Sequence, residues 1–273
     1  MTGIGTAGSP GTPTTAPPVG PVDGQSGVQR EPRRSLLGYL FMPVLLTVTG
    51  LALWLYVSRQ ELDSIEQRSL NADRLLEAVL RHVQLTVVST VIVIVIAVPL
   101  GVLLTRPGTA RARPLLLTLA NIGQAVPTIG VLALLAVAFL FLGFSAAVVG
   151  LVAYAVLPVL RNTMVGLEQV DESVLEAGRG MGLSKSQVLR RIELPLAVPI
   201  ILAGVRTALI INVGTATLAT FINGGGLGDI IVAGLSTNRV LVQVTGAALT
   251  AVLALLVDYL AGVAEDVLRP KGL

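Results

Sequence analysis

The sequence predicts an all-α polytopic membrane protein with about six transmembrane helices. The first observation is compositional: 53% of the 273 residues are hydrophobic and 13% are charged, whereas an average soluble domain carries about 25% charged residues. The second observation is that the apolar residues occur in long runs, with a mean hydropathy of +0.82. A soluble core of this composition would leave large apolar patches in water, so the predicted solvent is lipid.

The N-terminal segment, residues 1–29, is dominated by Gly, Pro, Thr, Ser and Val and has almost no charge. Such a segment buries too little apolar surface to offset its ordering entropy, so the prediction is a disordered tail. It lacks the basic start and apolar core of a secretory signal. Arg30, Arg33 and Arg34 lead directly into the first apolar run.

Six apolar runs are candidates for crossing about 30 Å of hydrocarbon, a distance that takes about 20 helical residues. They are Leu36–Val57, Leu85–Leu104, Ala125–Leu142, Ala146–Leu160, Pro199–Ile222 and Val240–Val263. Only Gly143, Phe144 and Ser145 separate the third run from the fourth. This short spacing predicts a helical hairpin.

Charge placement predicts the orientation of these spans. Basic residues cluster after the second span, between the fourth and fifth, and at the C-terminus: Arg106, Arg111, Arg113, Arg161, Arg179, Lys185, Arg190, Arg191, Arg269 and Lys271. With six spans these loops share one side, which the positive-inside rule makes cytoplasmic. The loop after the first span is mixed in sign and is predicted to lie outside. Both termini are then cytoplasmic.

The loop Glu176–Pro195, EAGRGMGLSKSQVLRRIELP, predicts two short helices joined by a tight turn. Ser173 precedes Glu176 by three residues and Ser184 precedes Gln187 by three, which is the spacing of a capping box. The three glycines between them, Gly178, Gly180 and Gly182, are able to adopt positive φ. Val188, Leu189 and Ile192 share one face at helical spacing. The expected result is a compact helical elbow with an apolar face.

This loop resembles the coupling loop of bacterial ABC importer permeases, whose pattern is E-A-A-x3-G-x9-I-x-L-P. The matching residues are Glu176, Ala177, Gly182, Ile192, Leu194 and Pro195. Gly178 stands where the family usually has alanine, and because it is small the packing role is expected to survive. The resemblance implies the type I ABC importer permease fold, and it implies that these seven residues couple the permease to a separate ATPase subunit.

The resemblance narrows to permeases of the osmoprotectant type, which import glycine betaine, carnitine, choline and related quaternary amines. It rests on segments such as RNTMVGLEQVDESVLEAGRGMG, ELPLAVPIILAGVRTA and GTATLATFINGGGLGD, and it covers roughly residues 80–265. Methionine-type importers share the GGGLGD ending, so methionine or another small solute is the alternative cargo. The chain is 4% aromatic, without the clustered aromatic residues that usually bind a quaternary ammonium. Selectivity is therefore expected in a separate binding protein.

The resemblance also implies the domain organisation and the partners. The expected segments are a disordered cytoplasmic tail, 1–35; a first transmembrane helix and outer loop, 36–80; a permease core, 81–265, with its coupling loop at 165–195; and a cytoplasmic C-terminal tail, 266–273. Expected partners are ATPase subunits, an extracytoplasmic substrate-binding protein, a second permease subunit (the same or a related chain) and membrane lipid, with no nucleic acid. The implied location is the bacterial cytoplasmic (inner) membrane.

Catalysis and metal binding are not expected in this chain. It has no GxxxxGK[ST] phosphate loop, so ATP and Mg²⁺ belong on the partner ATPase and the chain itself is no enzyme. It has no cysteine and one histidine, His82, which excludes a thiolate or His-rich metal site. His82 is interpreted as an interfacial residue of the second span rather than a pH sensor. The basic pI of about 9.7 is interpreted as topological.

Polar residues inside the spans are candidates for the translocation pathway or for helix packing: Arg206, Asn212, Gly214 and Asp258. For Arg206, snorkelling or a structural pairing is favoured over a place in the pathway, whereas Asn212 and Asp258 stay open between a bond across helices and a cavity position. The small residues of the fifth span, Gly214 among them, fit close packing and a pathway equally well.

The glycine-rich turn after the fifth span is interpreted as an outer gate, with a flexible outer loop as the alternative. Its residues are Gly224, Gly225, Gly226, Gly228 and Asp229.

Two alternatives to the importer come from other functional classes of membrane protein. One is a secondary carrier driven by an ion gradient, which would show broken helices, midplane charges and internal repeats. The other is a membrane scaffold that anchors an ATPase without transporting.

Overall fold

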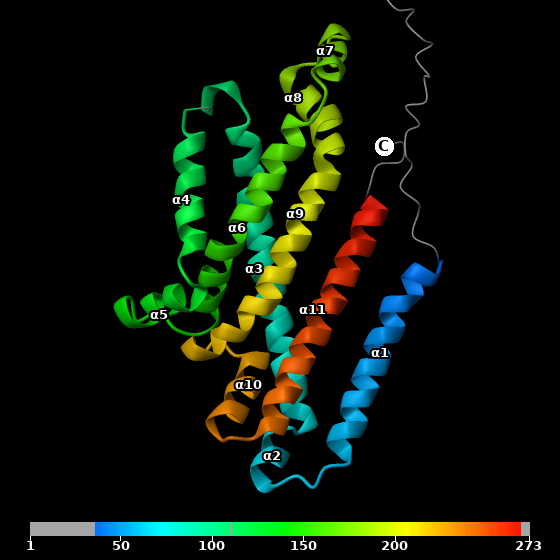
Figure 1. Cartoon of the computed structure of the whole chain (residues 1–273). Coiled ribbons are helices and arrows are strands. Elements are labelled where there is room, and N and C mark those ends of the chain that lie inside the picture. The colour runs from blue at the N-terminus through cyan, green and yellow to red at the C-terminus, as the bar shows by residue number, and fades with distance from the viewer. Residues whose placement is uncertain (1–35, 110, 269–273) are drawn as a thin grey trace, which may run out of the picture. The chain divides into compact units, whose positions relative to one another are not determined.

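Every regular element in residues 36–109 and 111–268, the part of the chain that the computed structural model describes, is helical (Figure 1). Within this part, five helices are long and apolar enough to cross a membrane, or six if a bent pair counts as one span. The all-α membrane class predicted from composition is therefore confirmed. The predicted N-terminal tail lies outside the described residues, as do the last five residues of the predicted C-terminal tail.

The helices follow one another in a simple order. They are α1 Leu36–Ser58, α2 Ser64–Ser69, α3 Ala72–Leu104, η1 Pro107–Thr109, α4 Arg113–Ala125, α5 Thr128–Ala138, α6 Phe144–Glu168, α7 Glu172–Gly180, α8 Lys185–Val188, η2 Leu189–Glu193, α9 Leu194–Thr215, η3 Ala216–Ile222, α10 Leu227–Ser236 and α11 Val240–Leu268. The elements α8, η2, α9 and η3 form one continuous helix, Lys185–Ile222.

The third span differs from the prediction. In place of one helix over Ala125–Leu142, the chain forms α4 and α5, whose axes meet at 89°. The break has a local cause, because Pro127 has no N–H to donate and disfavours helical dihedrals in the residue before it. Val126 is accordingly extended, with φ −75° and ψ 128°. The apolar residues of α5 thus turn away from the direction of α4 instead of continuing it.

The segment after α1, where a mixed-charge loop was predicted, is largely helical. Asp63 caps α2 in a capping box with Glu66. The helix α3 begins at Ala72, capped by the side chain of Asn71, rather than at Leu85. About 20 Å of helix therefore extends the second span at its N-terminal end. Of the charges that suggested a loop, Asp73, Arg74 and Glu77 lie at exposed positions of α3.

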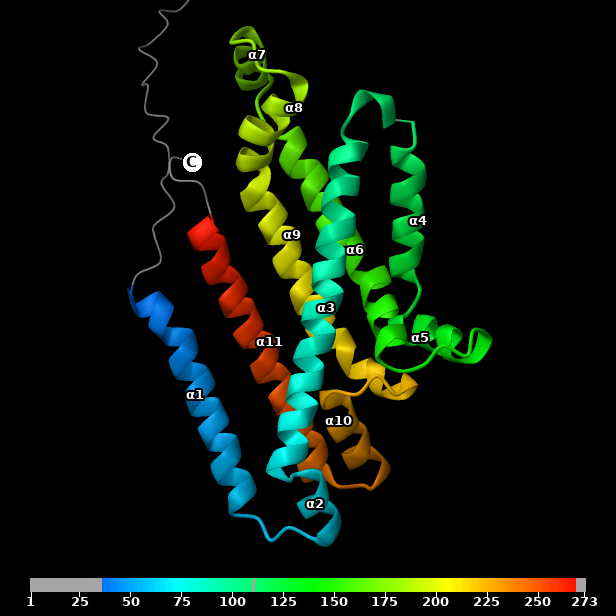
Figure 2. The same cartoon turned by 180° about the vertical axis from the view of Figure 1, so that it is seen from behind.

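The ends of the spans alternate as the charge pattern predicted. In Figures 1 and 2 the end of α3, the start of α4, the end of α6, the elements α7 and α8, and the end of α11 lie at one end of the described bundle. The elements α2 and α10 lie at the other end. The loops rich in arginine and lysine thus share one end.

Close contacts between small residues hold the central helix α6 in the bundle. A Cβ on Gly101 of α3 would lie 2.7 Å from Thr163, and one on Gly204 of α9 would lie 2.6 Å from Asn162. Small residues at such crossings let helix backbones approach closely, which is the main source of packing energy in lipid. Both α3 and α9 are thereby fixed against α6.

Candidate functional site

The predicted coupling loop is an elbow of three short helices, α7, α8 and η2, at the arginine-rich end of the bundle (Figure 1). The capping box predicted at Ser184 is present: Ser184 N–H donates to Gln187 Oε1 at 2.8 Å, and Gln187 N–H donates to Ser184 Oγ at 3.4 Å. The box predicted at Ser173 is wrong, because α7 begins at Glu172. Its cap is Asp171, which accepts from Ser173 N–H at 2.8 Å. That bond lowers the pKa of Asp171 below its ordinary value.

A left-handed glycine makes the turn between α7 and α8. Gly182 has φ +86° and its N–H donates to Arg179 O at 2.9 Å, while Leu183 N–H donates to Gly178 O at 3.2 Å. This pair of bonds is the Schellman motif that ends many helices. Of the three glycines that the sequence offered for positive φ, only Gly182 adopts it. Gly178 and Gly180 are helical residues of α7.

The apolar residues of the elbow pack against one another. Val188 is buried, and a Cβ on Gly178 would lie 2.6 Å from Ile192 Cδ1 and 3.7 Å from both Leu183 Cδ1 and Val188 Cγ2. The predicted apolar face therefore folds the elbow and is not offered to a partner as a whole. The outward surface carries Glu176, Ala177 and Met181, all exposed.

The elbow is connected to two spans. It continues into α9 without a break, and Pro195 lies at the junction of η2 and α9. Glu193, 5% exposed, forms an ion pair with Arg106 at the end of α3, with 2.5 Å between Nη2 and Oε2. A buried carboxylate needs such a partner. Sequence reasoning missed this pair, although an acidic residue at the start of an apolar run is a visible signal for it.

Two of the intramembrane polar residues form one ion pair. Arg206 of α9 donates through Nε and Nη2 to the two carboxylate oxygens of Asp258 of α11, at 2.6 and 2.8 Å. Glu265 lies 3.7 Å from the same guanidinium. The bidentate geometry is the stronger form of such a pair. It joins the elbow's own helix, α9, to α11.

The other two candidates differ from each other in burial. Asn212 is fully buried and its amide nitrogen donates to Thr90 Oγ1 of α3 at 2.9 Å, which links α9 to α3. Gly214 is exposed, and a Cβ built on it would meet no atom within 4 Å. Close packing within the described chain therefore explains Asn212 but not Gly214.

The glycine-rich turn at the opposite end is tightly packed. Gly225 and Gly226 have φ of +82° and +103°. A Cβ on Gly224 would lie 2.8 Å from the Cβ of Ala219, and one on Gly228 would lie 2.0 Å from Thr217 O. Each of these glycines is thus required by its backbone angle or by contact. Asp229 follows in the first turn of α10.

Two residues of α3 hold this turn. His82 is fully buried: its Nδ1 accepts from Leu227 N–H at 3.2 Å, which leaves Nε2–H to donate to Val213 O at 2.9 Å. The interpretation of His82 as interfacial is therefore wrong. Arg81 donates through Nε to Gly224 O at 3.1 Å and places its guanidinium 4.3 Å from the centre of the Phe144 ring.

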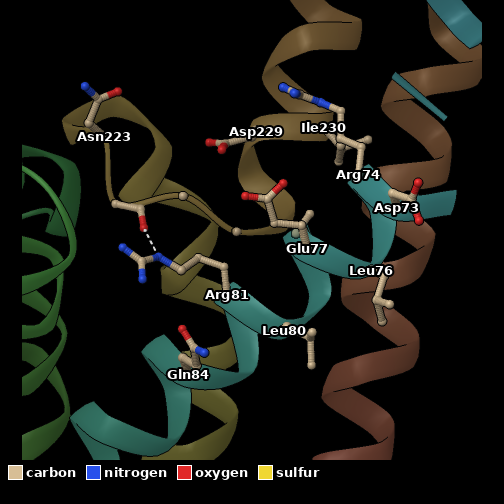
Figure 3. Close-up of a pocket in the computed structure, with 14 residues that line it drawn as sticks. Asp73, Arg74, Leu76, Glu77, Leu80, Arg81, Gln84, Asn223, Asp229 and Ile230 are labelled. Carbon is tan, nitrogen blue, oxygen red and sulfur yellow. Dashed lines mark hydrogen bonds between the residues drawn. The ribbon is translucent and has the colours of Figure 1, made fainter. Parts of the chain in front are cut away.

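A cleft of about 610 Å³ opens between the first turns of α3 and this turn. Figure 3 shows Arg81 pointing from α3 to the glycine turn, with Glu77 and Asp229 nearby. Acidic and basic side chains both line the cleft, Asp73, Arg74 and Glu77 on α3 among them. The cleft lies at the end of the bundle opposite the elbow.

A family model for the binding-protein-dependent transport system inner membrane component matches residues 97–271. The chain belongs to this family. The matched range contains the elbow, α9 and α11, whereas α1, α2 and most of α3 precede it. This membership makes the chain a non-enzymatic membrane subunit of a transport system and argues against both the ion-driven carrier and the scaffold.

Individual relatives of this permease agree with the family. The choline transport system permease protein OpuBB of Bacillus subtilis (strain 168) is 39% identical over 203 residues, which cover 74% of this chain and 92% of that protein. The carnitine transport permease protein OpuCD of Listeria monocytogenes serotype 1/2a (strain 10403S) is 41% identical over 207 residues, 76% and 92% of the two chains. The expected resemblance to osmoprotectant permeases is confirmed.

Comparison with a solved structure identifies the fold. A chain of the MetNI methionine ABC transporter, in an inward-facing conformation, superposes with a TM-score of 0.63 at 26% identity and covers 72% of this permease and 96% of that chain. The type I importer fold implied by the resemblance is thereby confirmed.

Proposed function

We propose that this permease imports quaternary-amine osmoprotectants, namely glycine betaine, carnitine and choline. The named cargoes of its relatives, at 39–41% identity over most of both chains, support this cargo class. The low aromatic content of 4% is consistent with a separate extracytoplasmic binding protein that selects the substrate.

The elbow around Gly182 is the proposed docking surface for an ATPase subunit. The observation that carries this assignment is the elbow's connection to the spans, through the unbroken helix Lys185–Ile222 and the Arg106–Glu193 ion pair. A push on the exposed surface Glu176–Met181 would move α9 and α3 together. ATP and Mg²⁺ would bind on the ATPase, whose closure would open the spans outward, and hydrolysis would reset them.

The orientation and assembly follow from the same proposal. The arginine-rich end, with the elbow, would face the cytoplasm, and the cleft beside Gly224–Asp229 would face the binding protein as an outer gate. A second permease subunit, the same chain or a related one, would complete the pathway. The tight packing of the glycine turn supports a gate with two discrete positions over a flexible loop.

Uptake of labelled glycine betaine in cells that lack the native gene tests this function. The cells carry wild type, Gly182→Asp or Gly182→Asn, with choline, carnitine and methionine as competitors. Asn and Asp are similar in size and both tolerate left-handed φ. We expect Gly182→Asp to insert normally but to abolish uptake, because a charge at the exposed turn blocks docking, and Gly182→Asn to retain most of it. Equal uptake by Gly182→Asp and wild type would refute the coupling role.

Methionine is the second candidate cargo, because the fold matches the MetNI methionine transporter. The competition arm decides between the two. Competition by choline and carnitine but not by methionine supports the quaternary amines, and the reverse supports methionine.

A further inference from the structure

Arg161 lies inside a span and not in the loop where the charge pattern placed it. The helix α6 continues to Glu168, so Arg161 is seven residues before its end. Its guanidinium Nη2 donates to Asn121 Oδ1 of α4. The Cα–Cβ bonds of an α-helix tilt toward its N-terminus. The N-terminus of α6 lies on the side away from the elbow. Arg161 therefore points along α6 toward the middle of the bundle rather than toward the nearby loop.

The bond to Asn121 is the middle one of three polar contacts between α4 and α6. At the elbow end, Arg113 of α4 pairs with Glu168 of α6. At the far end, Gln124 donates its amide to Tyr154 O at 3.0 Å. Asn121 is eight residues along α4 from Arg113, which is about 12 Å. The Arg161–Asn121 bond thus lies about two helical turns further from the elbow end than the Arg113–Glu168 pair.

Arg161 differs in its partners from three other arginines of the described bundle. Arg106, Arg113 and Arg206 each have a carboxylate at ion-pair distance. In the described part of the chain Arg161 has only the Asn121 amide oxygen, and its side chain is exposed. A charge at this depth is expensive in lipid and almost always faces a water-filled pathway or a partner.

The surroundings of Arg161 fit a pathway. Figures 1 and 2 show α6 beside both α4 and α9, and α3 packs against both α6 and α9. Beyond its polar first turns, α3 has large apolar exposed residues, Val87, Val91 and Val95 among them, which suits lipid. Those of α9 include the small Ala203 and Gly214. The exposed positions of α4 include large apolar residues as well, Leu115, Leu119 and Ile122, together with the small Gly123.

We propose that Arg161, oriented by Asn121, lines the translocation pathway and binds the carboxylate of zwitterionic substrates. Glycine betaine and carnitine carry a carboxylate beside their quaternary ammonium, whereas choline carries a hydroxyl. A guanidinium has five N–H donors, so the bond to Asn121 leaves a pair free for a bidentate carboxylate. The same charge repels a substrate that is only a cation. This assignment rests on the proposed import of quaternary amines, and it names the residue that favours zwitterionic substrates over choline.

Uptake ratios test this role, with the complete transporter and its wild-type binding protein in every strain. Uptake of labelled glycine betaine, carnitine and choline is measured for wild type, Arg161→Gln, Arg161→Lys and the control Arg113→Gln. Arg113→Gln removes an arginine from the same α4–α6 contacts but leaves Arg161 in place. The amount of each variant in the membrane and its melting temperature in detergent report folding.

We expect Arg161→Gln to lower uptake of both zwitterions about 10- to 100-fold, the range of a charged hydrogen bond, while choline uptake is kept or rises. Arg161→Lys should retain more of the zwitterion uptake, and Arg113→Gln should leave all ratios unchanged. An equal loss of all three substrates at normal amounts would show a structural role, and unchanged ratios would show that no carboxylate binds; either result overturns the proposal. Wild type that transports none of the three would instead refute the proposed cargo class.

Discussion

Gly178 shows how a single missing methyl group is accommodated in the elbow. Its α7 position is buried, and the atom that an added Cβ would meet at 2.6 Å is Ile192 Cδ1, the far end of a flexible side chain. Gly180, two residues on, has no atom within 4 Å of a built Cβ. The two glycines therefore offer a matched comparison between a filled and an open site on the same helix.

We expect Gly178→Ala to be tolerated, because the gain of about 1 kcal/mol in helix propensity offsets a small shift of Ile192. Gly178→Val should destabilise by about 1–3 kcal/mol, because its branched side chain overpacks the contact with Leu183 and Val188. Gly180→Ala should stabilise by up to about 1 kcal/mol. Thermal unfolding of the detergent-solubilised transporter measures all three. A Gly178→Ala variant as unstable as Gly178→Val would mean that Ile192 cannot move.

At the scale of elements, the apolar runs of the sequence predicted most spans but not the breaks in the helices or their lengths. Runs of apolar residues located α1, α6, α9 and α11, because membrane thickness sets a minimum length. The Val126–Pro127 step was visible as a helix breaker, yet the apolar composition on both sides concealed a bend of 89°. The start of α3 was missed because its polar first turns look like a loop in hydropathy.

Pairs between elements were beyond sequence reasoning for a different reason. Arg206 and Asp258 were each visible as unusual residues of apolar spans, but nothing in one sequence states that they face each other. Arg161 was assigned to a loop because the apolar run of α6 ends before it. A charge that ends a run and a charge that continues a helix look alike until the partner helix is known.

The Arg206–Asp258 pair predicts how α9 and α11 depend on each other. Removing one partner of a fully buried pair costs about 3–5 kcal/mol. Because about a quarter of each side chain is exposed, and Glu265 remains near Arg206, we expect Asp258→Asn to cost about 1–2 kcal/mol. The double variant Arg206→Leu with Asp258→Leu should recover much of that loss. Thermal unfolding of wild type, Arg206→Leu, Asp258→Leu and the double variant forms the double-mutant cycle that measures the pair, and additive losses would show that the two residues do not act together.

At the scale of the whole molecule, the elbow can work only if its motion reaches more than one span. Because the elbow is continuous with α9, its motion reaches that helix directly. The Arg206–Asp258 ion pair then transmits the motion from α9 to α11. The Arg106–Glu193 pair carries it to α3, whose far end holds the glycine turn through Arg81 and His82. Within the described residues, α3 thus contacts both the elbow and the glycine turn, as does the continuous helix Lys185–Ile222, which ends two residues before Gly224.

Breaking the Arg106–Glu193 pair should therefore uncouple transport from ATP hydrolysis. In Arg106→Gln the elbow surface stays intact, so the ATPase should still bind and hydrolyse ATP, but the motion of α3 should no longer follow. We expect uptake to fall about tenfold or more, the effect of losing a charged hydrogen bond of about 1.5–3 kcal/mol, while ATP hydrolysis by the purified complex changes little. The Arg113→Gln variant, which loses an exposed ion pair, serves as the control and should keep both activities. If Arg106→Gln lowered hydrolysis and uptake in parallel, the pair would support assembly of the complex and α3 would not transmit the motion of the elbow.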